Sequence, residues 1–159
     1  MNYVVNTNLK QDNIILSQLK KTEYVQELEF FLPIKNTLNS VEFNHVIKLF
    51  DPISNLSPKI FFNDVTGILQ GFIDLIFLWN KKYYILDYKS NWLGKDNKCY
   101  SINNIKKEII QHRYDLQYQI YTLAIHQYLK SKLKKYTYQE NFGGIFYLFL
   151  RGMNKKNNN

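Results

Sequence analysis

The segment from Ile68 to Tyr88 most constrains the fold, because two apolar runs flank a single polar pair, Asn80-Lys81. Asn readily adopts the left-handed conformation that a two-residue hairpin turn requires, so the segment predicts two antiparallel strands. Both strands are apolar on both faces, with Ile76, Leu78, Tyr83 and Ile85 on one and Ile73, Leu75, Phe77 and Leu86 on the other. Strands of this kind usually lie inside a sheet that helices cover.

The rest of the chain adds strands and one long helix. Residues 24–33 alternate as an extended strand that Pro33 is expected to end, and the apolar run at 143–150 predicts a last buried strand. A long helix is predicted over 105–132 from apolar residues at helical spacing, Leu116, Ile120, Leu123 and Ala124. The order strand, strand, strand, long helix, strand predicts a mixed α/β fold.

Two shorter segments lie between the first strand and the hairpin. Residues 39–50 predict a short helix, capped by Asn39 or Ser40. Residues 51–58 predict a loop, because proline, serine and asparagine are frequent there.

The length and composition fit one folded domain of 159 residues, 45% of them hydrophobic. We expect that domain over 23–153, with a poorly ordered lead-in over 1–22 and a disordered tail over 154–159. Cys99 is the only cysteine, which excludes a disulfide framework and a cysteine-built zinc site and fits a reducing compartment. The longest apolar stretch is too short to cross a bilayer, so we expect a cytoplasmic protein with no membrane partner.

Positive charge is concentrated in the second half of the sequence. Residues 1–90 hold nine basic and nine acidic residues, whereas residues 91–159 hold twelve basic and four acidic residues. A surface that binds a polyanion such as DNA has this asymmetry, and aromatic rings in the same half would stack on bases: Trp92, Tyr100, Tyr114 and Tyr118. The alternatives are a solvated basic helix and tyrosines that serve core packing.

Two carboxylates and an ammonium converge at one end of the predicted hairpin. The turn pairs Trp79 with Lys82, and the same register places Asp74 opposite Asp87, about 5 Å away on the same face. Lys89 lies two residues beyond Asp87 and therefore joins that face. Opposed carboxylates in an apolar sheet favour a hard cation such as Mg²⁺, with Lys89 orienting or deprotonating water or stabilising charge on a phosphate. The alternative is a structural ion triad in which Lys89 bridges both carboxylates.

Longer stretches around these residues resemble the C-terminal nuclease domain of the RecB family, which belongs to exodeoxyribonuclease V, the RecBCD complex. The matching stretches are GFIDLIF (71–77), ILDYKSNWLG (85–94), HRYDLQYQIYTLAIHQYL (112–129) and FGGIFYLFLRG (142–152), with a further match at ELEFFLPI (27–34). That domain is similar to the PD-(D/E)XK nucleases, so the resemblance implies a restriction-endonuclease-like α-β-β-β-α-β core. The first helix of that core is expected to be truncated here.

The resemblance also implies roles for individual residues. Asp74 and Asp87 would bind the metal, expected to be Mg²⁺, together with the backbone carbonyl of Tyr88, and Lys89 would be the catalytic lysine. Gln117 and Tyr121 match the family's Gln-x-x-x-Tyr motif and would face DNA or the active-site strand. The alternative for this pair is the polar edge of a packed helix.

Glu27 matches an acidic position on the family's first core strand, and the alternative is a solvent-facing carboxylate. Two features of the family have no match in this sequence. The family supplies a metal-binding histidine from a helix before the first core strand, whereas His45, His112 and His126 lie later in the chain. The phosphate loop of the helicase motor is also missing, so we expect a carboxy-terminal fragment without the helicase.

The resemblance therefore implies a Mg²⁺-dependent exodeoxyribonuclease of double-strand-break repair and recombination. Its partners would be DNA and subunits of the RecC and RecD type. The alternative is a catalytically inactive RecB remnant that binds DNA or docks on partner subunits.

Overall fold

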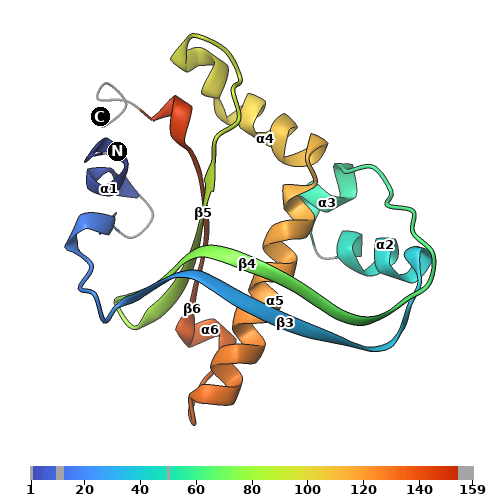
Figure 1. The fold of residues 1–159 in the computed structure, drawn as a ribbon. Helices are drawn as coiled ribbons and strands as arrows, with labels where there is room; N and C mark the ends of the chain where they lie inside the picture. The colour runs from blue at the N-terminus through green and yellow to red at the C-terminus, as the bar shows by residue number, and fades with distance from the viewer. Residues whose placement is uncertain (1, 10–12, 50, 154–159) are drawn as a thin grey trace.

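The computed structural model describes residues 2–9, 13–49 and 51–153 of the chain (Figure 1). Its centre is a four-stranded sheet in the order β3-β4-β5-β6, in which β3–β4 and β4–β5 are antiparallel and β5–β6 is parallel. The strands are β3 (Tyr24–Leu38), β4 (Val65–Trp79), β5 (Lys82–Lys89) and β6 (Phe142–Phe149). The predicted mixed α/β fold is confirmed, because helices flank this mixed sheet as in a PD-(D/E)XK core.

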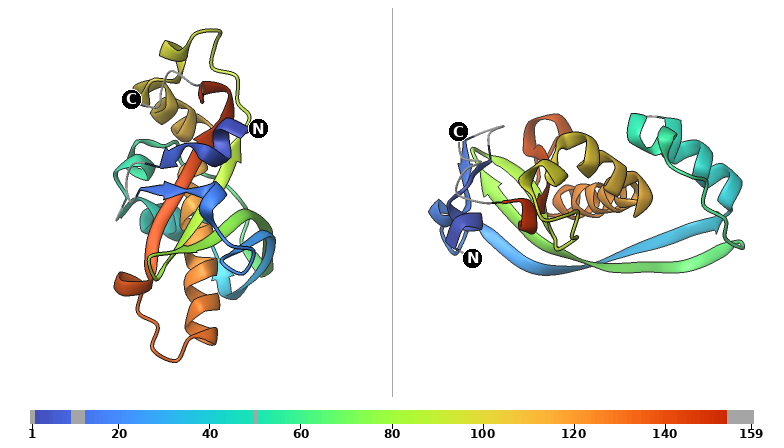
Figure 2. Two further views of the ribbon diagram at one scale, coloured as in Figure 1. Left: turned by 90° about the vertical axis from the view of Figure 1, so that its left-hand side faces the viewer. Right: turned by 90° about the horizontal axis from the view of Figure 1, so that it is seen from above.

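Helices lie on one side of the sheet, and the N-terminal segment lies on the other (Figure 2). The helices after β3 are α2 (Ser40–Leu49), α3 (Pro52–Leu56), α4 (Ile102–Gln111), α5 (Tyr114–Lys132) and α6 (Tyr138–Asn141). The N-terminal elements are α1 (Asn2–Asn6), β1 (Asn8–Leu9), β2 (Ile14–Ile15) and the 3₁₀ turn η1 (Leu16–Gln18). Two further 3₁₀ turns are η2 (Asn97–Tyr100) and η3 (Leu150–Gly152). Within the described residues, no helix has the length and apolar character needed to cross a membrane.

Each face of the sheet has its own apolar cluster. The first joins the sheet to α5 through Phe30, Leu32, Ile73, Ile76, Ile85, Tyr121, Ala124, Ile125 and Leu129. The second covers the opposite face and contains Leu75, Phe77, Tyr84, Leu86 and Leu148 together with Leu9, Ile14 and Leu16. The expected poorly ordered lead-in over 1–22 stays a prediction; among its described residues, Leu9, Ile14 and Leu16 belong to the second cluster. The predicted tail, 154–159, lies outside the described residues.

The predicted hairpin is confirmed in both turn and register. Asn80 and Lys81 have φ angles of 48° and 67°, the left-handed pair that matches the twist of the flanking strands. Trp79 pairs with Lys82, and the regular pairing continues inward to Leu75 and Leu86.

The expected face of Ile73 is wrong. Ile73 and Ile76 both belong to the cluster under α5, so the strict alternation of β4 changes between them, at Asp74 and Leu75. On β3, Glu27 is left-handed with a φ of 49°, and the pairs on either side of it place it opposite Asp74. The irregularity therefore lies beside Asp74, one of the two carboxylates that the sequence predicts to bind a metal.

Two expected element ends also differ. The first strand does not stop at Pro33, which pairs with Ile68, because β3 is an edge strand and, within the described residues, one side of its backbone bonds to no other strand. The predicted loop over 51–58 contains α3, whose first turn is capped by the Asp51 carboxylate through the amides of Ile53 and Ser54. Asp51 followed by Pro52 is a helix-start signal that the loop-like composition concealed.

The single helix expected over 105–132 is two helices. Arg113 separates α4 from α5 in the left-handed conformation, with a φ of 55°. Its guanidinium forms a two-point ion pair with Asp115, with Nε and Nη2 each 3.0 Å from a carboxylate oxygen, and Nη1 donates to the carbonyl of Pro58 at 2.6 Å. Ser54 Oγ donates to the same carboxylate at 2.7 Å. Contacts to a distant segment therefore hold the break, which explains why the local pattern did not predict it.

Candidate active site

The end of β5 brings two charged side chains into the interior beneath α5. Asp87 and Lys89 are 3% and 7% exposed, and they lie on the face of β5 that also carries Ile85. Lys89 Nζ lies 2.6 Å from Asp87 Oδ2 and donates to Gln117 Oε1 at 2.6 Å. The strand alternation predicted this shared face, and α5 supplies the third polar group.

Asp74 on β4 lies near Asp87, but not as its regular cross-strand partner. The regular β4–β5 pairs end at Leu75 and Leu86, one position before the expected pair of aspartates. Asp74 Oδ2 instead accepts a hydrogen bond from the backbone amide of Tyr88 at 2.8 Å. Within the described residues Lys89 contacts only one of the two carboxylates, that of Asp87, so the structure does not form the alternative ion triad.

Burial is the main influence on the Asp87 carboxyl. It raises the pKa above the ordinary 3.8, the hydrogen bond and charge of Lys89 lower it in part, and the nearby charge of Asp74 raises it again. Asp87 Oδ2 is also buried, and its contact within the described residues is the ion pair with the Lys89 ammonium. The buried Asp87 carboxylate and the nearby Asp74 carboxylate supply oxygen ligands of the kind that a hard cation prefers.

The Gln117–Tyr121 pair contacts the end of β5. Gln117 Nε2 donates to the Tyr121 hydroxyl at 2.9 Å, one helical turn away, while its other amide atom accepts from Lys89. Burial and the charge of Asp87 raise the pKa of Tyr121 to about 12. The Tyr121 ring packs edge-on against Phe30. The two residues connect α5 to the charged end of β5.

Two tyrosines that the sequence did not assign to the site enclose Lys89. Its Nζ lies 3.8 Å from the ring centroid of Tyr114, at the start of α5, and 4.7 Å from that of Tyr147, on β6. Tyr147 pairs with Asp87 in the parallel register of β5 and β6. The apolar run around Tyr147 predicts only a buried strand, and the register between strands far apart in sequence carried no local signal. For Tyr114 the sequence predicts base stacking or core packing, and neither prediction places it beside Lys89.

The other predicted residues lie outside this cluster. Glu27 is exposed on β3, opposite Asp74. His45 is exposed on α2, His112 Nε2 lies 3.1 Å from Glu108 Oε1, and His126 contacts the Tyr136 hydroxyl. Within the described residues, no group of three or more histidine, cysteine or acidic side chains is arranged to hold a metal.

The aromatic residues of the basic half have different surroundings. Trp92 is 63% exposed, whereas the Tyr118 hydroxyl donates to Asp51 and the Tyr100 hydroxyl bonds to the backbone of Asn91 and Leu93. Trp92 therefore has a ring available to a base, while both tyrosines have internal hydrogen bonds.

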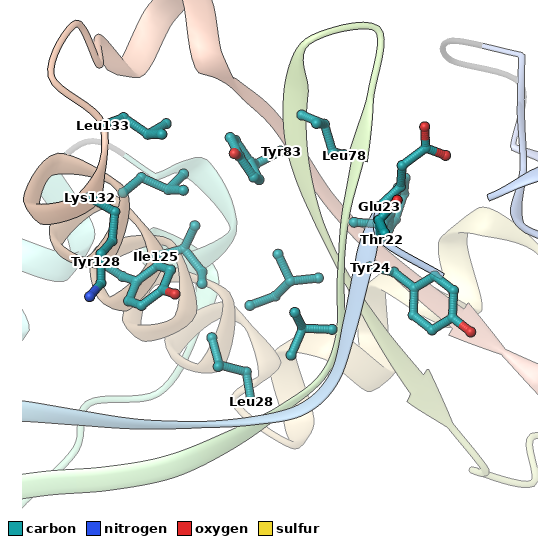
Figure 3. Close-up of a pocket in the computed structure, with 14 residues that line it drawn as sticks. Thr22, Glu23, Tyr24, Leu28, Leu78, Tyr83, Ile125, Tyr128, Lys132 and Leu133 are labelled. Atoms are coloured by element: carbon teal, nitrogen blue, oxygen red, sulfur yellow. The ribbon is translucent and has the colours of Figure 1, made fainter. Parts of the chain in front are cut away.

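A separate cavity of about 230 Å³ lies between α5 and the hairpin end of the sheet (Figure 3). Apolar side chains such as Leu28, Ile125 and Leu133 form most of its wall, with Glu23 and Lys132 among the residues around it. None of the predicted site residues lines it. The candidate chemistry is therefore at the charged end of β5 and not in this apolar cavity.

No family model matches the chain. Curated proteins do match it: it is 62% identical over 156 residues, 98% of this chain and 13% of the relative, to the RecBCD enzyme subunit RecB of Buchnera aphidicola subsp. Schizaphis graminum. It is 45% identical over 153 residues, 96% of this chain, to the RecBCD enzyme subunit RecB of Escherichia coli strain K12. The chain belongs to the RecB family.

The similarity concerns one region of the RecB relatives. This RecB-family chain spans about 13% of the length of these two RecB relatives. The resemblance to the RecB nuclease domain is confirmed by identity that runs through nearly the whole chain. The four-stranded mixed sheet with α5 across one face agrees with it.

Proposed function

We propose that this RecB-family chain is a metal-dependent nuclease region that hydrolyses DNA phosphodiester bonds. The observation that carries the proposal is the buried Asp87 carboxylate, which has Lys89 beside it and the charge of Asp74 nearby. Buried charges of this density cost stability unless they are paired or used. A nuclease uses all three, because phosphodiester hydrolysis needs a cation site and a group that handles water or developing negative charge.

Asp74, Asp87 and the backbone carbonyl of Tyr88 would hold the ion, proposed to be Mg²⁺, which suits a few carboxylate oxygens and retains waters. When bound, the ion would supply Lewis-acid polarisation of the phosphate and a more acidic water. Lys89 would place its ammonium against the attacking water or the developing charge. The Gln117 carbonyl oxygen holds that ammonium, and Tyr121 fixes the orientation of the Gln117 amide.

DNA would be held mainly through its phosphates. The basic half of the chain supplies lysines, and exposed Trp92 lies three residues beyond Lys89, the last residue of β5. Phosphate contacts position a duplex without reading its sequence, so little sequence preference is expected. In a longer RecB-type protein the region would work with RecC- and RecD-type subunits, in repair and recombination of DNA breaks.

The central test is release of acid-soluble nucleotides from linear DNA with and without Mg²⁺. We expect the parent to require the ion, Asp87→Ala to abolish release, and Lys89→Ala to lower it by about 10²–10³-fold. Asp64→Ala removes an exposed carboxylate and is the matched control, with unchanged release expected. Variants at Asp87 and Lys89 that cut as fast as the parent would overturn the site assignment.

A second candidate is an inactive module that binds DNA or docks on partner subunits. The observation that favours it is that none of the three histidines has a described contact with Asp74, Asp87 or Lys89. Titration with Mg²⁺ or Ca²⁺ while the melting temperature is followed separates the two. An ion bound to the folded state at a hundred times its Kd stabilises by about 2.7 kcal/mol. No shift, together with salt-sensitive DNA binding, would favour the inactive module.

A further inference from the structure

We propose that Tyr114 and Tyr147 form an aromatic clamp that positions the Lys89 ammonium, and that both are positioning residues for the reaction proposed above. The inference rests on that proposed function. Both side chains contact the Lys89 ammonium. Neither has a described contact with the carboxylate of Asp74 or Asp87. The residues come from α5 and β6, so the clamp exists only when the helix packs across the sheet.

The rings replace the water that an ammonium ordinarily keeps. Lys89 Nζ is 3.8 Å from the centroid of Tyr114 and 4.7 Å from that of Tyr147, within the range in which a ring face attracts a cation. The two ring centroids are 5.7 Å apart, with the planes inclined at 49°. Because Lys89 is almost fully buried, this attraction acts with little screening by solvent.

The Tyr147 hydroxyl adds a second restraint. The hydroxyl donates a hydrogen bond that two acceptors share, the backbone carbonyl oxygen of Tyr114 at 2.9 Å and Gln117 Oε1 at 3.0 Å. Burial and the charge of Asp87 raise the pKa of Tyr147, which keeps the hydroxyl protonated and therefore a donor. Tyr147 thus contacts the ammonium with its ring and holds the Gln117 oxygen with its hydroxyl.

The Tyr114 ring is held from its other end. Its hydroxyl donates to Asn91 Oδ1 at 3.1 Å, and the Asn91 amide donates to Glu108 on α4 at 2.7 Å. The clamp is needed because the Asp87 carboxylate serves two purposes. In the proposed function this carboxylate holds the cation, so it cannot be the sole anchor of Lys89. Gln117 and the two rings do not depend on it.

The test compares ring-keeping with ring-removing variants. Tyr114→Leu and Tyr147→Leu are expected to lower kcat by about tenfold or more, with KM for DNA within twofold of the parent. Tyr114→Phe keeps the ring and should retain most of the rate. Tyr147→Phe should be intermediate, because it keeps the ring but releases Gln117. Tyr128→Leu, on the exposed side of α5, is the control and should match the parent.

A spectroscopic measurement tests the clamp without any turnover. In metal-free protein, the ε-methylene protons of Lys89 should resonate upfield of the other lysines because of the ring currents of both tyrosines. Each leucine variant should remove part of that shift, and each phenylalanine variant should retain it. Where a leucine variant does not fold, the parent and the phenylalanine variants still give this result.

The outcomes separate the clamp from the nuclease proposal. Unshifted Lys89 resonances in the parent, or leucine variants with parental kcat, would overturn the clamp and leave the nuclease proposal standing. A parent that shows the ring-current shift but never cuts DNA would overturn the proposed function and leave the geometry of the clamp intact. Equal loss of kcat in the phenylalanine and leucine variants of Tyr114 would also count against the clamp, because the ring would not matter.

Discussion

At the scale of single residues, Lys89 explains why the site is built from so many polar and aromatic groups. A buried ammonium is costly unless its lost hydration is replaced. Asp87, the Gln117 oxygen and two tyrosine rings replace it. The same burial raises the pKa of the Asp87 carboxyl. The site therefore keeps charges that an ordinary core would have lost.

A second residue-scale feature is the close approach of β6 to β5. A Cβ built on Gly143 would overlap the ring of Tyr84, which is buried and stacked on Phe77. We expect Gly143→Ala to lower the free energy of unfolding by about 1–3 kcal/mol, since the ring has little room to move. Urea denaturation of the parent and the variant measures the difference.

The control uses the neighbour that causes the overlap. In a Tyr84→Leu background the smaller side chain leaves room for the added methyl group, so the same substitution should cost clearly less. An equal cost in both backgrounds would mean that the Tyr84 ring is not the obstacle.

At the scale of elements, the break between α4 and α5 places Tyr114, the first residue of α5, beside Lys89. Arg113 in its left-handed conformation is locked by Asp115, which is fully buried and also bound by Ser54 of α3. Tyr114, directly after the break, then faces Lys89. A continuous helix has no such change of direction, so the polar network on α3 takes part in placing the clamp.

The cap of α3 has a predictable pH dependence. Burial alone would raise the pKa of Asp51, but hydrogen bonds from Tyr118, Ser54 and two backbone amides lower it below 3.8. A carboxyl with a lowered folded pKa stabilises the fold above its unfolded pKa, and that contribution is lost as the pH falls through the folded value. We expect Asp51→Asn to be less stable than the parent at about pH 7, with the gap narrowing toward about pH 2.

Free energies of unfolding across that range measure the gap. Asp64→Asn, at an exposed carboxylate, should show a difference from the parent that barely changes with pH. A constant gap for Asp51→Asn would show that its hydrogen bonds do not favour the charged form.

At the scale of the whole molecule, the excess positive charge belongs to the half of the chain that follows β5. Lys106 and Lys107 are exposed on α4, and α4 is tied to the end of β5 through the bond from Asn91 to Glu108. Both lysines are therefore within two residues of a side chain that is bonded to the segment after β5. Binding to DNA should weaken as salt rises, because each phosphate contact releases counterions.

We expect Lys106→Gln/Lys107→Gln to reduce the slope of log affinity against log salt by about two for duplex DNA. Fluorescence anisotropy at several salt concentrations gives the slope. Lys20→Gln/Lys21→Gln removes the same charge from the net-neutral half and should leave it nearly unchanged. Equal reductions in both variants would mean that total charge, and not its placement, governs binding.

Part of the fold could be predicted from the sequence alone. The hairpin, its turn and its register followed from alternation and from Asn80-Lys81. The last strand and the order of elements followed as well. The helix break at Arg113, the helix after Asp51 and the face of Ile73 did not. The helix break and the helix after Asp51 depend on hydrogen bonds to residues far away in the sequence. The face of Ile73 depends on a local irregularity between β3 and β4.

The candidate site divides in the same manner. The sequence alone placed Asp87 and Lys89 on one face and Asp74 near them, because a strand repeats every two residues and the turn fixes the register. Only the tertiary structure turned Asp74 toward the Tyr88 amide and brought Tyr147 beside Lys89. Strand periodicity is a property of the local backbone, whereas the parallel register of β5 and β6 joins two strands that α4, α5 and α6 separate in the chain.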